Sequence, residues 1–131
     1  MSKQLFLVCA LALMSFSVVW AWTLQEQQPP TAEQTVNLSA ERFSFTPSQV
    51  KTRVGTTLTI RLTSDDTAHG FRIIGTNVSV EIPKRSRGVR TVTFTPDKAG
   101  RYTFECSRLC GAGHSFMRGV IVVEDGSEDQ R

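Results

Sequence analysis

The sequence lacks a strong excess of charge of either sign. Its 131 residues include 15 basic and 12 acidic side chains, and Lys3 is the only charged residue before Glu26. The remainder of the chain therefore carries 14 basic side chains against 12 acidic ones. Because this excess is small and no motif of stacking aromatic residues accompanies it, the sequence argues against a nucleic-acid-binding protein.

Helical periodicity is also missing after residue 35. No segment there repeats its apolar residues with a period of 3.6, and no internal repeat or low-complexity tract is present. Apolar and polar residues alternate instead in several short runs, at residues 58–62, 90–94 and 102–106. Two further runs, residues 71–74 and the β-branched residues 120–123, are also expected strands. Turn residues separate these runs, at positions 47–48, 54–55, 75–77, 83–88 and 96–100. Many short strands at this spacing predict an all-β fold, a Greek-key β-sandwich or barrel.

Charged residues are absent from residues 5–22, an 18-residue and mostly apolar run. Lys3 precedes the run and no basic residue follows until Arg42, an asymmetry that places the N-terminus in the cytoplasm and the domain outside. We consider two interpretations. The run is a membrane-anchoring helix, for which 18 residues just suffice, or a signal peptide cleaved after Val19-Trp20-Ala21. Its Cys9 does not fit a lipoprotein cysteine, because the preceding Val8 is not small.

These features divide the chain into four parts. Residues 1–22 are the expected membrane anchor or signal peptide, and residues 23–35, rich in Gln with two Pro, are an expected linker. Residues 36–125 form the predicted β domain, and residues 126–131 are a C-terminal tail. One domain is what a chain of this length accommodates.

Cysteine is scarce, and two of the three cysteines lie close together. Cys106, Cys110, His114 and Met117 fall within twelve residues and supply two thiols, an imidazole and a thioether. Thiolate and thioether ligands select copper(I), zinc or iron–sulfur clusters over magnesium or calcium. Glycines between the second Cys and the His permit a tight backbone path, so we expect a loop that presents its donors to a common centre.

The number of donors favours more than one metal ion. His69 is the only other histidine, and with Cys110, His114 and Met117 it would complete a mononuclear blue-copper set. Cys106 would then be left over, whereas two copper ions sharing both sulfurs would use every donor. A Cys106–Cys110 disulfide is the structural alternative in an oxidising compartment. It would close a very short loop, add little stability and leave the other donors unexplained.

The motif Cys-x-x-x-Cys-Gly-x-x-His-Ser-Phe-Met, from Cys106 to Met117, resembles the copper A loop of cytochrome c oxidase subunit II. Residues 69–80 resemble the segment that supplies the first histidine in that family. The resemblance runs from about Ala40 to Glu124 and is strongest to the short subunit II of the B-type oxidases. It implies a cupredoxin fold with one N-terminal hydrophobic helix, and a centre of two copper ions.

The resemblance also implies a ligand set. His69 and Met117 would serve one copper, His114 and the backbone carbonyl of Arg108 would serve the other, and Cys106 and Cys110 would bridge both. Arg108 stands where many members of the family have a glutamate that helps to hold magnesium, so we expect no magnesium site. The copper ligand at this position is a main-chain carbonyl, which the change to arginine preserves.

The function implied by the resemblance is electron transfer at the outer, periplasmic face of the bacterial cytoplasmic membrane. The chain would accept electrons from a c-type cytochrome or a small cupredoxin and pass them to the haem-bearing subunit I of a terminal oxidase. It contains no oxygen-reducing centre, so it would be a subunit of an enzyme rather than a complete one. Two alternatives remain: a free-standing exported copper-binding cupredoxin, serving as a carrier or in a stress response, and a mononuclear blue-copper carrier.

Two surface features concern partners. Both Trp residues lie in residues 1–22, so the aromatic electron-entry patch of larger relatives is missing, and we expect Phe43 and Phe45 to be weaker substitutes. Residues 84–90 form a basic run, Lys-Arg-Ser-Arg-Gly-Val-Arg. Such a run is either a solvated loop or a site that docks an acidic partner or anionic lipid.

Overall fold

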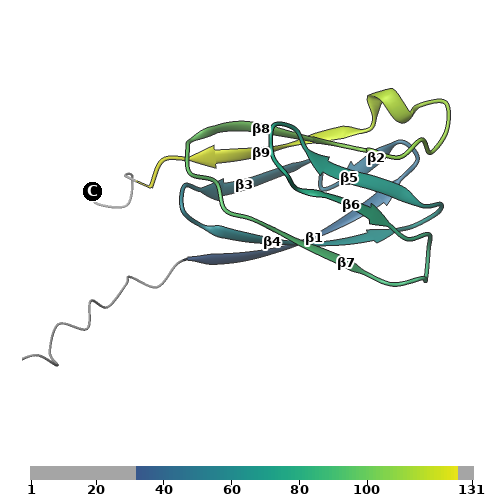
Figure 1. The fold of residues 1–131 in the computed structure, drawn as a ribbon, viewed down its shortest axis with the longest axis horizontal. Coiled ribbons are helices and arrows are strands. Elements are labelled where there is room, and N and C mark those ends of the chain that lie inside the picture. The colour runs from purple at the N-terminus through teal and green to yellow at the C-terminus, as the bar shows by residue number, and fades with distance from the viewer. Residues whose placement is uncertain (1–31, 127–131) are drawn as a thin grey trace, which may run out of the picture. The chain divides into compact units, whose positions relative to one another are not determined.

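The computed structural model describes residues 32–126, and this part of the chain forms a β-sandwich (Figure 1). Its elements, in chain order, are β1 (Glu33–Glu41), β2 (Ser44–Thr46), β3 (Gln49–Arg53), β4 (Thr57–Ser64), β5 (His69–Ile73), β6 (Ser79–Ile82), β7 (Arg90–Phe94), β8 (Gly100–Glu105), the 3-10 turn η2 (His114–Phe116) and β9 (Arg118–Glu124). Within the described range no helix is long and apolar enough to cross a membrane. The predicted anchor or signal peptide at residues 1–22 lies outside the described residues.

Two sheets make the sandwich. The first has the strand order β2-β1-β4-β7 and the second has the order β3-β9-β8-β5-β6. The pairs β1–β4 and β3–β9 are parallel, and the other pairs are antiparallel. The predicted all-β sandwich is therefore confirmed, and the turns between strands fall where the glycine- and proline-containing segments predict them.

The core follows from the period-two alternation. In β4, Leu58, Ile60 and Leu62 are fully buried, whereas the side chains between them are less buried or exposed. Burying one such side chain contributes about 1.5–3 kcal/mol, so this pattern fixes which face of the strand points inward. Phe71 and Phe104 lie 5.4 Å apart between ring centroids in the middle of the core. The buried cluster extends to the predicted metal donors at one end of the sandwich.

The structure shifts three sequence-based boundaries. β1 begins at Glu33, which pairs with Thr57 of β4, so residues 33–35 of the predicted linker belong to a strand. His69 is the first residue of β5 and does not precede it, and β5 ends at Ile73. Cys106 directly follows β8, which ends at Glu105. These shifts arise because pairing with neighbouring strands, which sequence alternation does not report, decides where each strand begins and ends.

Candidate metal centre

Three segments that are distant in the sequence meet at one end of the sandwich. They are the turn between β1 and β2, the start of β5 with His69, and the loop between β8 and β9 that contains Cys106 to Met117 (Figure 1). The backbone N–H of Cys106 donates to the carbonyl of Met117 over 3.0 Å, which closes the base of this loop. We call residues 106–117 the ligand loop. Its donors are held by strands at both ends.

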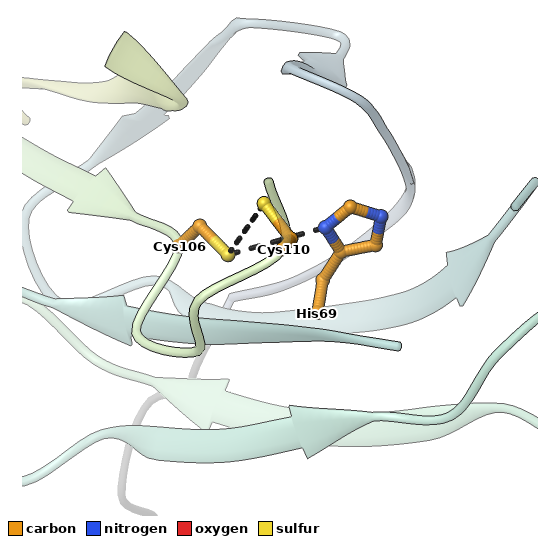
Figure 2. Close-up of side chains that lie close together, drawn as sticks. All are labelled: His69, Cys106 and Cys110. Atoms are coloured by element: carbon orange, nitrogen blue, oxygen red, sulfur yellow. Dashed lines mark hydrogen bonds between the residues drawn. The ribbon is translucent and has the colours of Figure 1, made fainter. Parts of the chain in front are cut away.

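The two cysteine sulfurs lie at the middle of the site. Cys106 and Cys110 are free thiols whose Sγ atoms are 3.8 Å apart, well beyond the roughly 2.0 Å of a disulfide bond. Both sulfurs could therefore hold the same metal ion. The imidazole of His69 points at the same place, with Nδ1 4.0 Å from Cys106 Sγ (Figure 2). The structure therefore presents a compact His-Cys-Cys group whose ligand atoms lie within 4.8 Å of one another.

The remaining predicted donors surround the same two sulfurs. His114 Nδ1 and Met117 Sδ are each 3.8 Å from Cys110 Sγ, and the carbonyl oxygen of Arg108 is 3.0 Å from Cys106 Sγ. All six predicted donors therefore gather at one site. The assignment of His69 and Met117 to one ion, and of His114 and the Arg108 carbonyl to the other, stays a prediction.

Burial distinguishes the donors. His69 and Met117 are 0% and 1% exposed, and both cysteines are buried. His114, on η2, is partly exposed. A crevice of about 230 Å³ reaches Cys106 and His114 from the solvent, between the side chains of Arg72 and Arg118. The site is thus enclosed by the core and meets the surface mainly through His114.

The orientation of His69 is set by a carboxylate. Asp66 Oδ1 lies 2.7 Å from His69 Nε2, so Nδ1 is left to face the sulfurs. Burial alone would raise the pKa of Asp66, but hydrogen bonds from His69 and from the backbone N–H groups of Thr67 and Arg42 outweigh it and lower the pKa. Asp66 therefore stays ionised and holds the imidazole. A metal-ligating histidine commonly donates its second N–H to a carboxylate in this way.

Arg42 connects the two halves of the site. Its backbone N–H donates to Asp66 Oδ2 over 3.1 Å, and its side-chain Nε donates to the carbonyl of Cys110 over 2.9 Å. One residue of the β1–β2 turn thus contacts both the carboxylate behind His69 and the ligand loop. The sequence-based prediction included neither Asp66 nor Arg42. The one signal available for Asp66 was its position three residues before His69, and the sequence offers none for Arg42.

Two glycines allow the ligand loop to lie close to its supports. A Cβ on Gly70 would lie 2.2 Å from Ser107 Oγ and 2.7 Å from the backbone nitrogen of Arg108, and one on Gly113 would lie 2.3 Å from the ring of Phe43. Neither position accommodates a side chain without movement of the loop or of Phe43. The N–H of Gly70 also donates to Cys106 Sγ over 3.5 Å, so β5 supports the sulfur directly.

The chemistry of the donors fits copper. The site gathers soft thiols and a thioether with two imidazoles, and the carboxylate of Asp66 already accepts a hydrogen bond from His69. Burial, followed by the neighbouring Cys106 thiol, raises the pKa of Cys110 to about 11. The thiol is therefore protonated at neutral pH without metal, and a metal ion that binds there must displace the proton.

The prediction that Phe43 and Phe45 offer an aromatic surface for electron entry is wrong for Phe45. Phe45 is 2% exposed and packs in the core against Phe104 at 5.3 Å between centroids, so it offers no surface for electron entry. Phe43 is 36% exposed and covers Gly113. Phe116 and Leu109 on the ligand loop, which the sequence did not single out, are each 80% exposed.

Comparison with known proteins agrees with this fold. The family model described as Cupredoxin-like domain matches residues 13–123. Cytochrome c oxidase subunit 2 of Thermus thermophilus is 36% identical over 91 residues, which cover 70% of this chain and 66% of that protein. This chain therefore spans slightly less than two thirds of the relative's length.

Solved structures show the same architecture. One chain from a cryo-EM structure of a heme-copper terminal oxidase dimer is 28% identical, has a TM-score of 0.62 and matches over 92% of this chain and 95% of its own length. The periplasmic domain of subunit II of cytochrome oxidase (CoxB) of Bradyrhizobium japonicum superposes with a TM-score of 0.66 at 19% identity, over 77% of this chain and 91% of that one, and supports the fold alone. The chain belongs to the family of cupredoxin-like domains, and its relatives include cytochrome c oxidase subunit 2.

Proposed function

We propose that this chain is the copper A electron-transfer domain of a terminal oxidase, of the subunit II type. The observation that carries the proposal is the ligand set itself. Five soft or borderline side-chain donors and one carbonyl lie around two sulfurs that are 3.8 Å apart, in a chain similar to an oxidase subunit 2. This similarity and these donors support a copper electron-transfer role.

Two copper ions use the donors better than one. A single blue-copper ion takes two His, one Cys and a weak axial Met, which would leave Cys106 as a buried thiol beside the metal without a role. In the proposed centre Cys106 and Cys110 would hold both ions. His69 and Met117 would complete one ion, and His114 with the Arg108 carbonyl would complete the other.

Copper bound at this site would supply a one-electron redox couple. The protein holds the donors in place, limits the access of water and supplies hydrogen bonds to the ligands. β5 carries His69, and β8 and β9 hold the two ends of the ligand loop, which limits the movement of the donors between oxidation states. Most of the donors are buried, so water has little access to them. The carboxylate of Asp66 accepts a hydrogen bond from His69, and the N–H of Gly70 donates one to Cys106 Sγ. These neighbours tune the potential of a metal site.

The partners and location follow as part of the proposal. The chain would take electrons from a c-type cytochrome or small cupredoxin and deliver them to the haem-bearing subunit I. It would do so at the periplasmic side of the membrane, attached through residues 5–22 if that segment is not cleaved. The similarity to a cytochrome c oxidase subunit 2 and to a chain of a terminal oxidase supports this placement.

The test is purification of the tagged full chain from its own membranes in mild detergent. We expect a haem-bearing subunit to co-purify, and copper to be present in constant proportion to this chain. Reduction by a reduced c-type cytochrome should then appear first in the copper absorption and afterwards in the haem absorption. The Cys110→Ser variant should still co-purify but lose the first phase.

A copper-loaded chain that is recovered without any haem subunit would contradict the oxidase assignment. It would instead identify the protein as a free-standing copper carrier.

A further inference from the structure

Two large apolar side chains lie exposed beside the metal centre. Leu109 precedes Cys110 in the chain, Phe116 precedes Met117, and each of these apolar side chains is 80% exposed. Both belong to the ligand loop, and His114, the partly exposed donor, lies between them in the sequence. Single exposed apolar side chains are common on protein surfaces. Exposed apolar side chains that are grouped beside a functional site indicate a contact surface for another macromolecule.

A basic loop lies at the same end of the sandwich as these side chains (Figure 1). The loop between β6 and β7 carries Lys84, Arg85 and Arg87, all exposed, at the same end of the sandwich as the ligand loop (Figure 1). It starts next to the metal centre, because Ile82 at the end of β6 pairs with His69. The backbone N–H of Arg85 also donates to the carbonyl of Asp66 over 3.1 Å.

Three acidic side chains near this end are paired, whereas Glu41 at the end of β1 and Asp65 after β4 form no ion pair within residues 32–126. Glu81 binds Arg108, Glu105 binds Arg72, and Asp66 binds His69. By contrast, Lys84, Arg85 and Arg87 form no ion pair within residues 32–126. The loop between β6 and β7 therefore carries three unpaired basic side chains at the same end of the sandwich as the exposed apolar side chains, against two unpaired acidic ones there.

We infer that this docking face, made of Leu109, Phe116, Lys84, Arg85 and Arg87, binds a one-electron redox protein whose own contact surface is apolar at its centre and acidic at its edge. The inference rests on the proposed function, and it names the charge of the electron donor. In the encounter the reduced partner loses one electron and the copper centre gains one, with no proton or bond exchanged.

An acidic protein fits this face better than an anionic membrane does. Leu109 and Phe116 belong to the same loop as His114, the least buried of the side-chain donors, so the occupant must be able to exchange electrons there. A lipid bilayer over His114 would block that exchange. Opposite charges at the edge of a contact mainly raise the rate of encounter and fix orientation.

The test uses the copper-loaded full chain in a neutral detergent and two oxidised c-type cytochromes of similar size. One has an acidic surface around its haem edge and the other a basic one. Because the cytochromes are kept oxidised, titration calorimetry reports binding without electron transfer. We expect the acidic cytochrome to bind more tightly, with an affinity that falls as salt is added.

Charge-reversal variants locate the contact. Combined Lys84→Glu, Arg85→Glu and Arg87→Glu should weaken binding of the acidic cytochrome about tenfold or more. The matched control changes Arg53, Lys98 and Arg101 to Glu, three exposed residues at the strand ends away from the metal centre. The control should leave binding within about twofold of the parent. Leu109→Ser with Phe116→Ser should weaken binding and leave its salt dependence unchanged.

Three results would overturn the inference. The first is tighter binding of the basic cytochrome, and the second is an equal effect of the charge reversal and its control. The third is a charge reversal that abolishes binding to phosphatidylglycerol vesicles while cytochrome binding is unchanged. That result would assign the basic loop to the membrane. Copper content is measured on the same samples. A failure of docking is thereby separated from a failure of the proposed copper centre.

Discussion

His69 and Asp66 are joined by a hydrogen bond of 2.7 Å between the imidazole Nε2 and the carboxylate Oδ1. Because this bond occupies one ring nitrogen, the other faces the sulfur of Cys106 at 4.0 Å. Asp66 is in turn held by the backbone N–H of Arg42. The metal centre is thus supported by a carboxylate outside the ligand set, and substitution of Asp66 tests the importance of that support.

Asp66→Ala should lower copper affinity about 10–100-fold, which is typical of losing a carboxylate behind a ligating histidine. Asp66→Asn should have a smaller effect, because its amide oxygen still accepts from Nε2. A competition titration with a copper chelator measures both. Asp97→Ala, in the exposed turn between β7 and β8, is the control. Parent-like affinity in Asp66→Ala would remove Asp66 from the account.

Gly70→Ala should damage the metal centre while the sandwich still folds. The added Cβ would lie 2.7 Å from the backbone nitrogen of Arg108, so the ligand loop must move away from β5. Such overpacking costs about 1–3 kcal/mol of stability. Copper content and far-ultraviolet circular dichroism should separate the two effects. Gly126→Ala, where a Cβ meets nothing within 4 Å, is the matched control. A Gly70→Ala protein with an unchanged copper spectrum would show that this close approach is unimportant.

Cys106→Ser should reduce copper from two ions per chain to one. Cys110, His114, Met117 and His69 would remain as a blue-copper set, so the absorption should change to that of a single copper–thiolate bond. Metal analysis together with the visible spectrum tests this. Cys9→Ser should leave both unchanged. Two coppers and the parent spectrum in Cys106→Ser would mean that Cys106 does not bridge.

The metal-free protein should lose stability in alkali through Cys110. Burial and the Cys106 thiol raise the pKa of Cys110 from 9.0 to about 11. The unfolded chain therefore loses this proton first as pH rises. The stabilisation is fully present below about pH 9 and is lost through about pH 11. We expect a loss of about 2 kcal/mol, since one pKa unit corresponds to about 1.4 kcal/mol.

Urea unfolding in reducing buffer, at about pH 8 and about pH 10.5, measures this loss. Other groups titrate in the same range, so the quantity compared is the difference between the parent and Cys110→Ser. Equal pH dependence in the two proteins would exclude a contribution from Cys110.

The sandwich and the donor cluster between Cys106 and Met117 could be predicted from the sequence because both depend on local information. Strand alternation at Leu58–Leu62 and the spacing of Cys106, Cys110 and His114 can be read within a few residues. Arg42 could not be found, because its contacts to Asp66 and Cys110 span 24 and 68 positions of the chain.

The two aromatic residues near the β1–β2 turn illustrate the same limit. Phe43 lies in the turn between β1 and β2, where the period of two is interrupted, whereas Phe45 lies within β2 and is buried. Sequence alone treats them alike. Leu109 and Phe116 lie in the ligand loop, where no periodicity reports which side chains face solvent, so their exposure becomes visible only in the folded chain.

The central claim is that Cys106 and Cys110 hold two copper ions between them. The most direct measurement is the copper-to-protein ratio of the reduced, copper-loaded chain after reoxidation, combined with its EPR spectrum. For the proposed centre we expect two coppers per chain and a purple form in which one unpaired electron is shared by two copper nuclei. One copper per chain, with the EPR spectrum of a single blue-copper ion, would contradict it.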